Sequence, residues 1–366
     1  MRTRGAVLTE VGGPLEVVDL ELDPPGPGEL LVRVRATGLC HSDLSVIDGS
    51  RVRPLPMVLG HEAAGEVVGT GPGASEFAVG DRVVLSFVPA CGACRWCVAG
   101  RQALCEPGAA ANRAGTLLGG ERRLRLPDGT RPHHHLGVSG FAEHAVVSEK
   151  SATRVPDDLP FDVAALFGCA VLTGAGAAFY SAGVAPGDRV AVFGLGGVGL
   201  AALLAARAAG ATQLVAVDVV PAKRELALAL GATDQVEGGP DAVEAVRSLT
   251  GGGADKVIDT TGVAAVLEQA YLATGAGGTT VTVGLPHPDR TVSLPALSLV
   301  AEERTLKGSY LGSCVPRRDV PRFVALHRAG LLPVHELLSG RLSLEEVNVG
   351  FTRLASGEAV RQVVVP

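Results

Sequence analysis

Four cysteines fall within residues 91–105. Cys91, Cys94, Cys97 and Cys105 have the spacing Cys-x2-Cys-x2-Cys-x7-Cys. Thiolates spaced in this way can surround one tetrahedral Zn²⁺ and leave no vacant position, which is the ligation of a structural zinc site. Four unrelated cysteines or a disulfide pair are the alternatives. Disulfides are disfavoured because the chain starts with an alternating strand pattern and not with the apolar core of a signal peptide. We therefore predict a structural zinc ion on these four cysteines.

A second stretch that could do chemistry is rich in glycine. Gly194, Gly196 and Gly199 fit the pattern G-x-G-x-x-G, after an apolar run at 190–193 and before an Ala/Leu-rich run at 198–209. Strand, glycine turn and helix together suit a dinucleotide, because the turn brings backbone close to the pyrophosphate and the helix N-terminus offers free N–H groups. The pattern predicts a dinucleotide-binding βαβ unit.

An acidic residue supports this interpretation of the glycine pattern. Asp218 ends the next predicted strand, 213–218, and lies 19 residues beyond Gly199. A carboxylate about 20 residues after the glycines holds the adenosine ribose in such units, and it repels a 2′-phosphate. We expect NAD in preference to NADP. A glycine-rich turn followed by an unrelated Asp is the alternative.

Composition limits the class of protein. The chain has 366 residues, enough for about two domains, with 47% hydrophobic residues and a net charge of −6. The acidic balance gives no electrostatic footprint for nucleic acid. No apolar run of about 18 residues continues without Gly or charge, so we expect no membrane span and a cytoplasmic protein.

The surrounding elements change character along the chain. Residues 1–90 have strand character, for instance at 30–36 and 65–69, and 106–140 is expected to be irregular. An alternation of strands and helices follows from 162 to 300, which predicts a doubly wound parallel sheet. The predicted strands are 190–193, 213–218, 255–260 and 278–284, and the predicted helices are 198–209, 221–230, 241–249 and 263–273. One further helix is expected near 319–329.

Three more candidate metal ligands are dispersed. Cys40 lies in Gly-Leu-Cys-His-Ser-Asp, His61 in Gly-His-Glu and Cys169 in Phe-Gly-Cys-Ala. Residue type alone does not unite them, because single buried Cys and His residues are more often packed in a core than bound to a metal.

With these motifs, the four-cysteine segment and the glycine turn, the chain resembles the zinc-dependent medium-chain alcohol dehydrogenases over essentially its whole length. The long 106–140 segment is similar to the liver-type and thiol-dependent formaldehyde dehydrogenases of that family. The resemblance implies an α/β fold: a GroES-like β-rich catalytic domain at 1–170, a Rossmann domain at 171–309, and a return to the catalytic domain at 310–366.

The resemblance implies a catalytic Zn²⁺ on Cys40, His61 and Cys169, with a fourth position open to water or alcohol, and hence two zinc ions per chain. Such an ion acts as a Lewis acid that lowers the pKa of a bound hydroxyl, and hydride then passes from the zinc-bound alkoxide to the nicotinamide. Asp43 would orient His61. Glu62 would be a carboxylate behind the ligands or a transient ligand; the alternative is a solvated surface charge.

The resemblance also implies roles for residues near the cofactor. Ser42 would take the alcohol proton, and Ser45 replaces a histidine that often continues the relay. His41 and Arg361 would contact the pyrophosphate. The full set of expected cofactor-binding residues is His41, Thr173, Gly194, Gly196, Gly197, Val198, Gly199, Asp218, Lys223, Val283, Leu285 and Arg361, of which Lys223 would contact the ribose and Thr173 the nicotinamide.

The substrate pocket implied by the resemblance consists of Ser42, Phe87, His135, Leu136 and Leu285, with Arg51 at its mouth. Formaldehyde dehydrogenases of the family place an arginine four residues after the last cysteine of the lobe, where this chain has Ala109. The run His133-His134-His135 could suggest a further metal, but adjacent side chains diverge, so we expect a loop.

These observations predict an NAD-linked zinc alcohol dehydrogenase that reversibly oxidises primary or secondary alcohols to aldehydes or ketones. The alternative is an S-(hydroxymethyl)thiol dehydrogenase, that is, a thiol-dependent formaldehyde dehydrogenase. A non-catalytic zinc- and nucleotide-binding protein is a third hypothesis. Liver-type relatives pair through their nucleotide domains, so we expect a homodimer, or a homotetramer built from such dimers. The sequence does not identify the physiological alcohol.

Overall fold

The structure is a computed structural model that describes all 366 residues. The chain divides into two compact units. The first comprises Met1–Cys169, Val315–Val324 and Leu338–Pro366, and the second comprises Ala170–Cys314 and Ala325–Leu337. The division after Cys169 lies next to the expected boundary at 170, whereas part of the tail, 325–337, clusters with the second unit.

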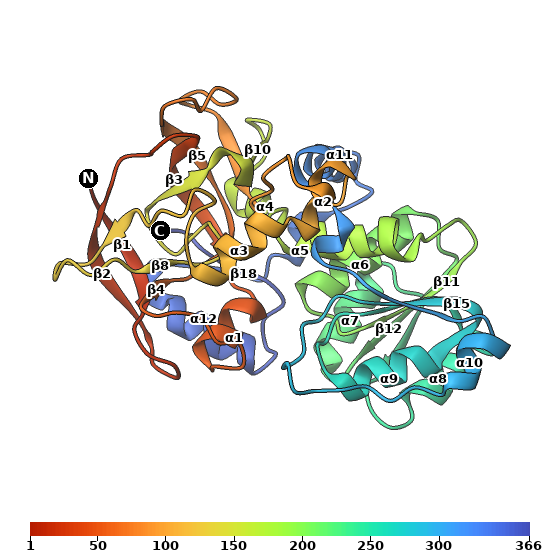
Figure 1. Ribbon diagram of the computed structural model, residues 1–366. Coiled ribbons are helices and arrows are strands. Elements are labelled where there is room, and N and C mark those ends of the chain that lie inside the picture. Colours follow the sequence, from red (N-terminus) through yellow and green to blue (C-terminus); the bar gives the residue numbers. More distant parts are fainter. The chain divides into compact units, whose positions relative to one another are not determined.

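The first unit is built on two sheets (Figure 1). One has the strand order β7-β2-β1-β4-β8, and the other has the order β10-β6-β5-β3-β18-β17 with β9 paired to β3. The strands are β1 (Arg2–Leu8), β2 (Leu15–Leu22), β3 (Glu29–Gly38), β4 (Met57–Val58), β5 (Glu62–Thr70), β6 (Arg82–Leu85), β7 (Leu124–Arg125), β8 (His133–His134), β9 (His144–Ser148), β10 (Ala152–Arg154), β17 (Gly340–Leu342) and β18 (Gln362–Val364).

Strand β3 shows why these residues form a half-buried sheet. Leu30, Val32 and Val34 are buried in one core cluster, while Arg33, between Val32 and Val34, and Arg35, directly after Val34, are exposed. Side chains alternate between the two faces of a strand, so this period of two places every second residue in the core. The β-rich catalytic domain expected from the sequence is confirmed.

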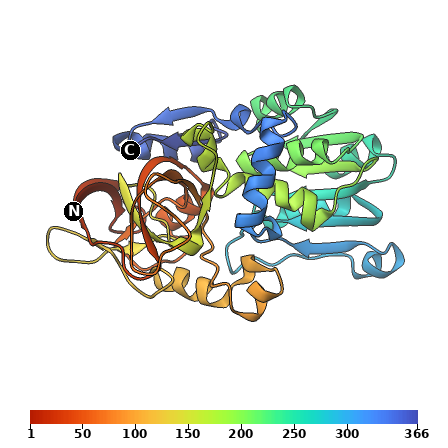
Figure 2. The same cartoon turned by 90° about the horizontal axis from the view of Figure 1, so that it is seen from above.

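Short helices connect these strands. They are α1 (His41–Ile47), α2 (Arg95–Val98), α3 (Glu106–Ala114), α4 (Phe161–Leu166) and α12 (Val347–Ala355). Helix α11 (Pro316–Arg328) begins in the first unit and ends in the second. The C-terminal strand β18 pairs with β3, Val363 opposite Gly38, so the end of the chain returns to the N-terminal strands of this unit (Figure 2).

The second unit is a six-stranded parallel sheet with the order β13-β12-β11-β14-β15-β16. Its strands are β11 (Arg189–Phe193), β12 (Gln213–Asp218), β13 (Asp234–Glu237), β14 (Ala254–Asp259), β15 (Thr274–Thr282) and β16 (Thr305–Gly308), and its helices are α5 (Ala170–Gly176), α6 (Gly197–Ala208), α7 (Pro221–Ala229), α8 (Ala242–Leu249), α9 (Ala264–Ala273) and α10 (Ala296–Ala301). Helix α6 covers one face, and α8 and α9 cover the other (Figure 1). This order is that of the doubly wound dinucleotide-binding fold, as predicted.

Some elements escaped the sequence analysis. Strand β13 has the burial pattern of a partly exposed edge, with only Val236 buried, so its apolar signal is weak. Strand β16, at the other edge, is also largely exposed. Edge strands lose one neighbour, and their sequences need not be apolar on both faces.

The expectation that 106–140 is irregular was wrong at its start, where α3 forms. The Cys105 side chain caps this helix by accepting from the Gly108 N–H at 3.4 Å, and Gly115 ends it with φ +67. Capping through a cysteine sulfur is an uncommon signal, so the helix was not predicted.

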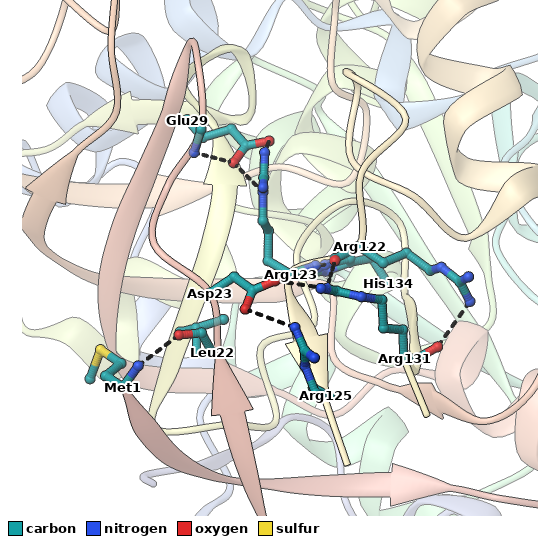
Figure 3. A network of polar contacts seen from close by, with 10 residues as sticks. Met1, Leu22, Asp23, Glu29, Arg122, Arg123, Arg125, Arg131 and His134 are labelled. Carbon is teal, nitrogen blue, oxygen red and sulfur yellow. Dashed lines mark hydrogen bonds and ion pairs between the residues drawn. The ribbon is translucent and has the colours of Figure 1, made fainter. Parts of the chain in front are cut away.

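Arginines tie down the rest of this segment (Figure 3). Arg123 pairs with Glu29 at 2.8 Å, and Arg131 pairs with Asp23 at 2.8 Å. The Arg123 backbone N–H donates to Nε2 of His134 at 3.1 Å. Burial lowers the pKa of His134 to about 3, which keeps the ring a neutral acceptor. Ion pairs and hydrogen bonds therefore hold this segment against the rest of the first unit.

None of the helices is long and apolar enough to cross a lipid bilayer.

Candidate active site and metal centres

Three candidate zinc ligands that are far apart in the sequence meet in the first unit. A ligand atom from each of Cys40, His61 and Cys169 lies within 4.8 Å of the other two. The residues are 8%, 1% and 5% exposed. The structure thus assembles the set that residue types alone could not unite.

Each of these ligands directly precedes a helix or a strand. Cys40 precedes α1 with extended backbone (φ −131, ψ 151), His61 directly precedes β5, and Cys169 directly precedes α5. The Leu39 N–H donates to the Gln362 carbonyl at 2.9 Å, which ties the start of α1 to β18. The backbone of these elements therefore positions the three ligands.

The pKa values of these three side chains are shifted by burial and by one another. Hydrogen bonding with Cys169 lowers the pKa of Cys40 well below its usual value, and the same contact, with burial, raises the pKa of Cys169 well above it. Burial alone would lower the pKa of His61, but the charge of Asp43 outweighs it and raises that pKa. Two thiolates and one imidazole are the soft donor set that suits Zn²⁺, and three protein donors leave a position open. The residues present fit a catalytic zinc ion.

Asp43 is buried behind His61. Its Oδ1 lies 3.1 Å from Nδ1 of His61 and accepts the Gly60 N–H at 3.0 Å. Burial would raise the pKa of Asp43, but His61 and His135 together lower it to about 2, so the group is a carboxylate. Because Nδ1 of His61 faces this carboxylate, Nε2 is the nitrogen available to a metal. This is the geometry expected of the orienting role.

Glu62 is fully buried, so the alternative of a solvated charge was wrong. Its Oε2 lies 3.3 Å from Nη1 of Arg361, and neither carboxylate oxygen has a hydrogen bond. Burial raises the pKa of Glu62 to about 8. Nη1 of Arg361 also donates to the Leu39 carbonyl at 2.6 Å, while its Nε has no partner. Arg361 is itself only 3% exposed, so Glu62 and Arg361 form a buried pair.

Helix α1 carries the expected proton acceptor. Ser42 is half-buried in the first turn, and His41 is exposed. The Ser45 hydroxyl donates to the His41 carbonyl at 2.9 Å, one turn back along the helix. The Ser45 hydroxyl hydrogen is thus engaged by the helix backbone.

Two of the expected pocket residues surround the ring of His61. Phe87 meets it edge to face at 5.6 Å between ring centroids, and His135 does so at 5.4 Å. Leu136 is buried beside His135, with φ +53. Arg51 is half-exposed, and its backbone N–H donates to the Ser45 carbonyl. Leu285 belongs to the second unit and is 46% exposed.

The four cysteines of the lobe also converge. Their Sγ atoms all lie within 4.8 Å of one another, and no disulfide joins them. Backbone N–H groups point at the sulfurs: Cys91 N–H lies 3.2 Å from Sγ of Cys105, and Cys94 N–H lies 3.3 Å from Sγ of Cys91. Backbone hydrogen bonds lower the pKa of Cys94 to about 6, and burial raises that of Cys97 to about 12. The closed set of four thiol donors fits a structural zinc ion.

In the second unit, the glycine turn joins β11 to α6. Gly194 has φ +87, and a side chain at Gly199 would place Cβ 1.8 Å from the Gly194 carbonyl oxygen. A Cβ at Gly196, in contrast, would meet no protein atom within 4 Å. The first and third glycines are required by the protein itself, whereas the space above Gly196 fits a ligand that approaches the backbone.

The remaining nucleotide candidates surround this turn. No side chain caps α6, so its first N–H groups, including those of Gly197 and Val198, are available to an anion. Asp218 accepts the Leu195 N–H at 2.7 Å and the Val220 N–H at 2.8 Å.

Further candidates lie on other elements of the unit. Lys223 is half-exposed on α7, Thr173 is buried on α5, and Val283 follows β15. The carboxyl ends of parallel strands are where this fold binds its ligand.

Comparison with known proteins agrees with this geometry. Residues 26–157 match the family model of the alcohol dehydrogenase GroES-like domain. Residues 197–328 match that of the zinc-binding dehydrogenases.

Two curated relatives are similar over their full lengths. The NDMA-dependent alcohol dehydrogenase of Amycolatopsis methanolica is 42% identical, covering 100% of this chain and 99% of the relative. The S-(hydroxymethyl)glutathione dehydrogenase of Paracoccus denitrificans is 36% identical, covering 100% of both. The crystal structure of an alcohol dehydrogenase zinc-binding domain protein from Burkholderia ambifaria has a TM-score of 0.96 at 38% identity, covering 100% of this chain and 99% of that one. The chain therefore belongs to the family of zinc-dependent medium-chain alcohol dehydrogenases.

Proposed function

We propose that this protein is an NAD-linked zinc alcohol dehydrogenase that reversibly oxidises primary or secondary alcohols to aldehydes or ketones. The observation that carries the proposal is the buried convergence of Cys40, His61 and Cys169, with Asp43 behind the histidine. Zinc bound by these donors would act as a Lewis acid on the substrate oxygen, and the nicotinamide would accept the hydride.

The chain's own residues have distinct tasks in this proposal. Asp43 would fix the ring of His61. The Ser42 hydroxyl would accept the proton of the substrate hydroxyl while its own proton passes on to the cofactor ribose. Glu62 remains a candidate transient ligand, since its oxygens have no hydrogen bond and Arg361 holds it at ion-pair distance. Phe87, His135 and Leu136 would line the substrate pocket, together with Arg51 and Leu285.

The cofactor is proposed to be NAD. Gly194, Gly196, Gly197, Val198 and Gly199 supply the turn and the start of α6 for the pyrophosphate, and His41 and Arg361 would neutralise its charge. Asp218 would hold the ribose together with Lys223, while Thr173, Val283 and Leu285 would contact the nicotinamide end. The support is the open space at Gly196 and the carboxylate at the end of β12.

Oxidation of an S-(hydroxymethyl)thiol is the second candidate. The relative from Paracoccus denitrificans bears this activity in its name, and the long segment 106–140 is retained. Ala109, at the position where the family places a thiol-binding arginine, is exposed and carries no charge. Because no cation stands there to hold a thiol carboxylate, we place simple alcohols first.

A second copy of the chain is the proposed partner. Strand β16 is an open edge of the second unit's sheet, and α10 exposes Leu297 (77%) and Val300 (80%). Open edges and exposed apolar side chains are features that proteins cover by association. We propose a homodimer, or a homotetramer built from dimers; a monomeric mass in light scattering would contradict this.

The function is tested by initial rates with a panel of alcohols of increasing length, aromatic alcohols, and formaldehyde with and without thiols. We expect turnover of simple alcohols with NAD and no need for thiol. A second arm supplies NDMA as the acceptor, since one relative is named for it. Activity confined to formaldehyde plus thiol would favour the second candidate, and no turnover in any arm would contradict both.

Metal analysis should find two zinc ions per chain. A chelator should remove activity before it unfolds the protein, because the lobe is closed and the three-donor site keeps an open position. Cys94→Ala should lose the lobe zinc alone. One or no zinc in folded, unchelated wild-type protein would contradict the two-site assignment.

Replacing Asp218 should relax cofactor choice. Asp218→Gly and Asp218→Asn both remove the charge that repels a 2′-phosphate, so the ratio of kcat/KM for NADP to that for NAD should rise about tenfold or more, corresponding to about 1.4 kcal/mol. Asn keeps an acceptor for the Leu195 or Val220 N–H and controls for loosening of the turn. Equal use of both cofactors by wild type would show that Asp218 does not discriminate.

Ser42→Ala should lower the single-turnover rate by about 10²–10⁴, the range for a positioned proton-transfer group. Ser42→Thr should remain active, because the hydroxyl survives. Ser45→Ala should cost little, since its hydroxyl already donates to the His41 carbonyl. Deuterated alcohol identifies whether hydride transfer limits the rate. A Ser42→Ala enzyme close to wild type would mean that water takes the proton directly.

A further inference from the structure

His135 lies against the carboxylate that orients a zinc ligand. Its Nδ1 is 2.9 Å from Oδ1 of Asp43, the same oxygen that lies 3.1 Å from Nδ1 of His61. The two imidazole rings stand nearly perpendicular, at 88°, with centroids 5.4 Å apart. Asp43 is thus shared by two histidines, only one of which belongs to the ligand set.

Backbone pairing brings the two histidines together. Strand β8 runs parallel to β4, with Met57 opposite His133 and Val58 opposite His134. The residue after β8 is His135, and His61 follows β4 by three residues. The turn that follows β8 is fastened to the same segment, since Gly140 N–H donates to the Gly60 carbonyl at 2.9 Å.

A tight turn aims the ring of His135. Its backbone N–H donates to the Ser139 hydroxyl at 3.0 Å, and its carbonyl accepts the Val138 N–H at 3.0 Å. The next residue, Leu136, has φ +53, a left-handed conformation that side-chain-bearing residues adopt at a cost. The chain holds this unfavourable conformation at the point that directs His135 toward Asp43.

Nδ1 of His135 has no hydrogen-bond partner other than the nearby carboxylate of Asp43. The residue is 1% exposed, and Nδ1 has no well-aligned hydrogen bond, although Oδ1 of Asp43 is within reach. An N–H placed there would join those of Gly60 and His61 around a single carboxylate oxygen. Three donors restrict rotation of a carboxylate more than two, and the carboxylate fixes the plane of the zinc-binding ring.

We propose that His135 is a positioning residue for the catalytic zinc site, acting on His61 through Asp43. The proposal deepens the proposed function and rests on zinc binding by Cys40, His61 and Cys169. Removing the His135 donor should let the carboxylate and the ring of His61 turn, so zinc should leave faster. Residues behind metal ligands typically change metal affinity 10–100-fold; for His135, one step further out, we expect about tenfold.

Three substitutions of His135 distinguish the effect of its hydrogen-bond donor from the effect of its flat ring. His135→Phe keeps a flat ring and removes both nitrogens. His135→Asn can place an amide N–H near the position of Nδ1, and His135→Gln places it near that of Nε2. His133→Phe is the matched control, because His133 is the same residue type two positions earlier, half-exposed, and bonded to the Ala114 carbonyl instead.

The primary measurement is the rate of zinc transfer to a colorimetric chelator, with zinc content per chain before and after. The zinc of the four-cysteine lobe is the internal reference and should be unchanged. We expect His135→Phe and His135→Gln to release the other zinc about tenfold faster, and His135→Asn and His133→Phe to remain within about twofold of wild type. Cobalt substitution gives a second readout, since the absorption bands of the three-donor site should broaden or shift only in the first pair.

Each outcome has a definite meaning. Equal release rates for wild type and His135→Phe, or for Asn and Gln, would overturn the role of His135 while leaving the proposed function intact. Wild-type protein without zinc at the three-donor site would overturn the proposed function itself. If His135→Phe fails to fold, the comparison of Asn with Gln, at matched thermal stability, still decides the question.

Discussion

The structure depends on one constraint, which is that the charges buried around Cys40, His61 and Cys169 must balance. Two sulfurs, an imidazole and the carboxylates of Asp43 and Glu62 are all withdrawn from water. Burying a lone charge costs far more than burying an apolar group, so each must face a partner of opposite sign. Asp43 contacts the ring of His61 and accepts the Gly60 N–H, and Glu62 lies at ion-pair distance from Arg361. A divalent cation would compensate the charge of the two sulfurs.

The first unit positions the residues that take part in this charge balance. His61 directly precedes β5, and Arg361, which directly precedes β18, comes from the far end of the chain to Glu62. Close packing leaves little freedom there: a Cβ on Gly38 would come within 2.8 Å of the Glu62 side chain. Arginine ion pairs at Glu29 and Asp23 then hold the long segment whose end carries His135.

A different constraint shapes the nucleotide unit, because its backbone N–H groups must be free to bind an anion. Asp218 accepts two N–H groups at the glycine turn, so the turn is shaped before any ligand arrives. The free start of α6 then provides N–H groups and a partial positive charge. One carboxylate therefore both orders the turn and supplies the group that would distinguish the ribose hydroxyl from a phosphate.

The sequence by itself determined the features that depend on local pattern. Period-two burial in β3, the strand–turn–helix at Gly194 to Gly199 and the cysteine spacing of the lobe each lie within a few residues, and local sterics or ligand reach decides them. It could not unite Cys40, His61 and Cys169, which the motifs linked only through a family resemblance. Nor could it reveal that His135 faces Asp43 or that Arg361 faces Glu62. Those contacts follow from the pairing of β4 with β8 and of β3 with β18, and strand partners distant in sequence are chosen by the packing of the whole sheet.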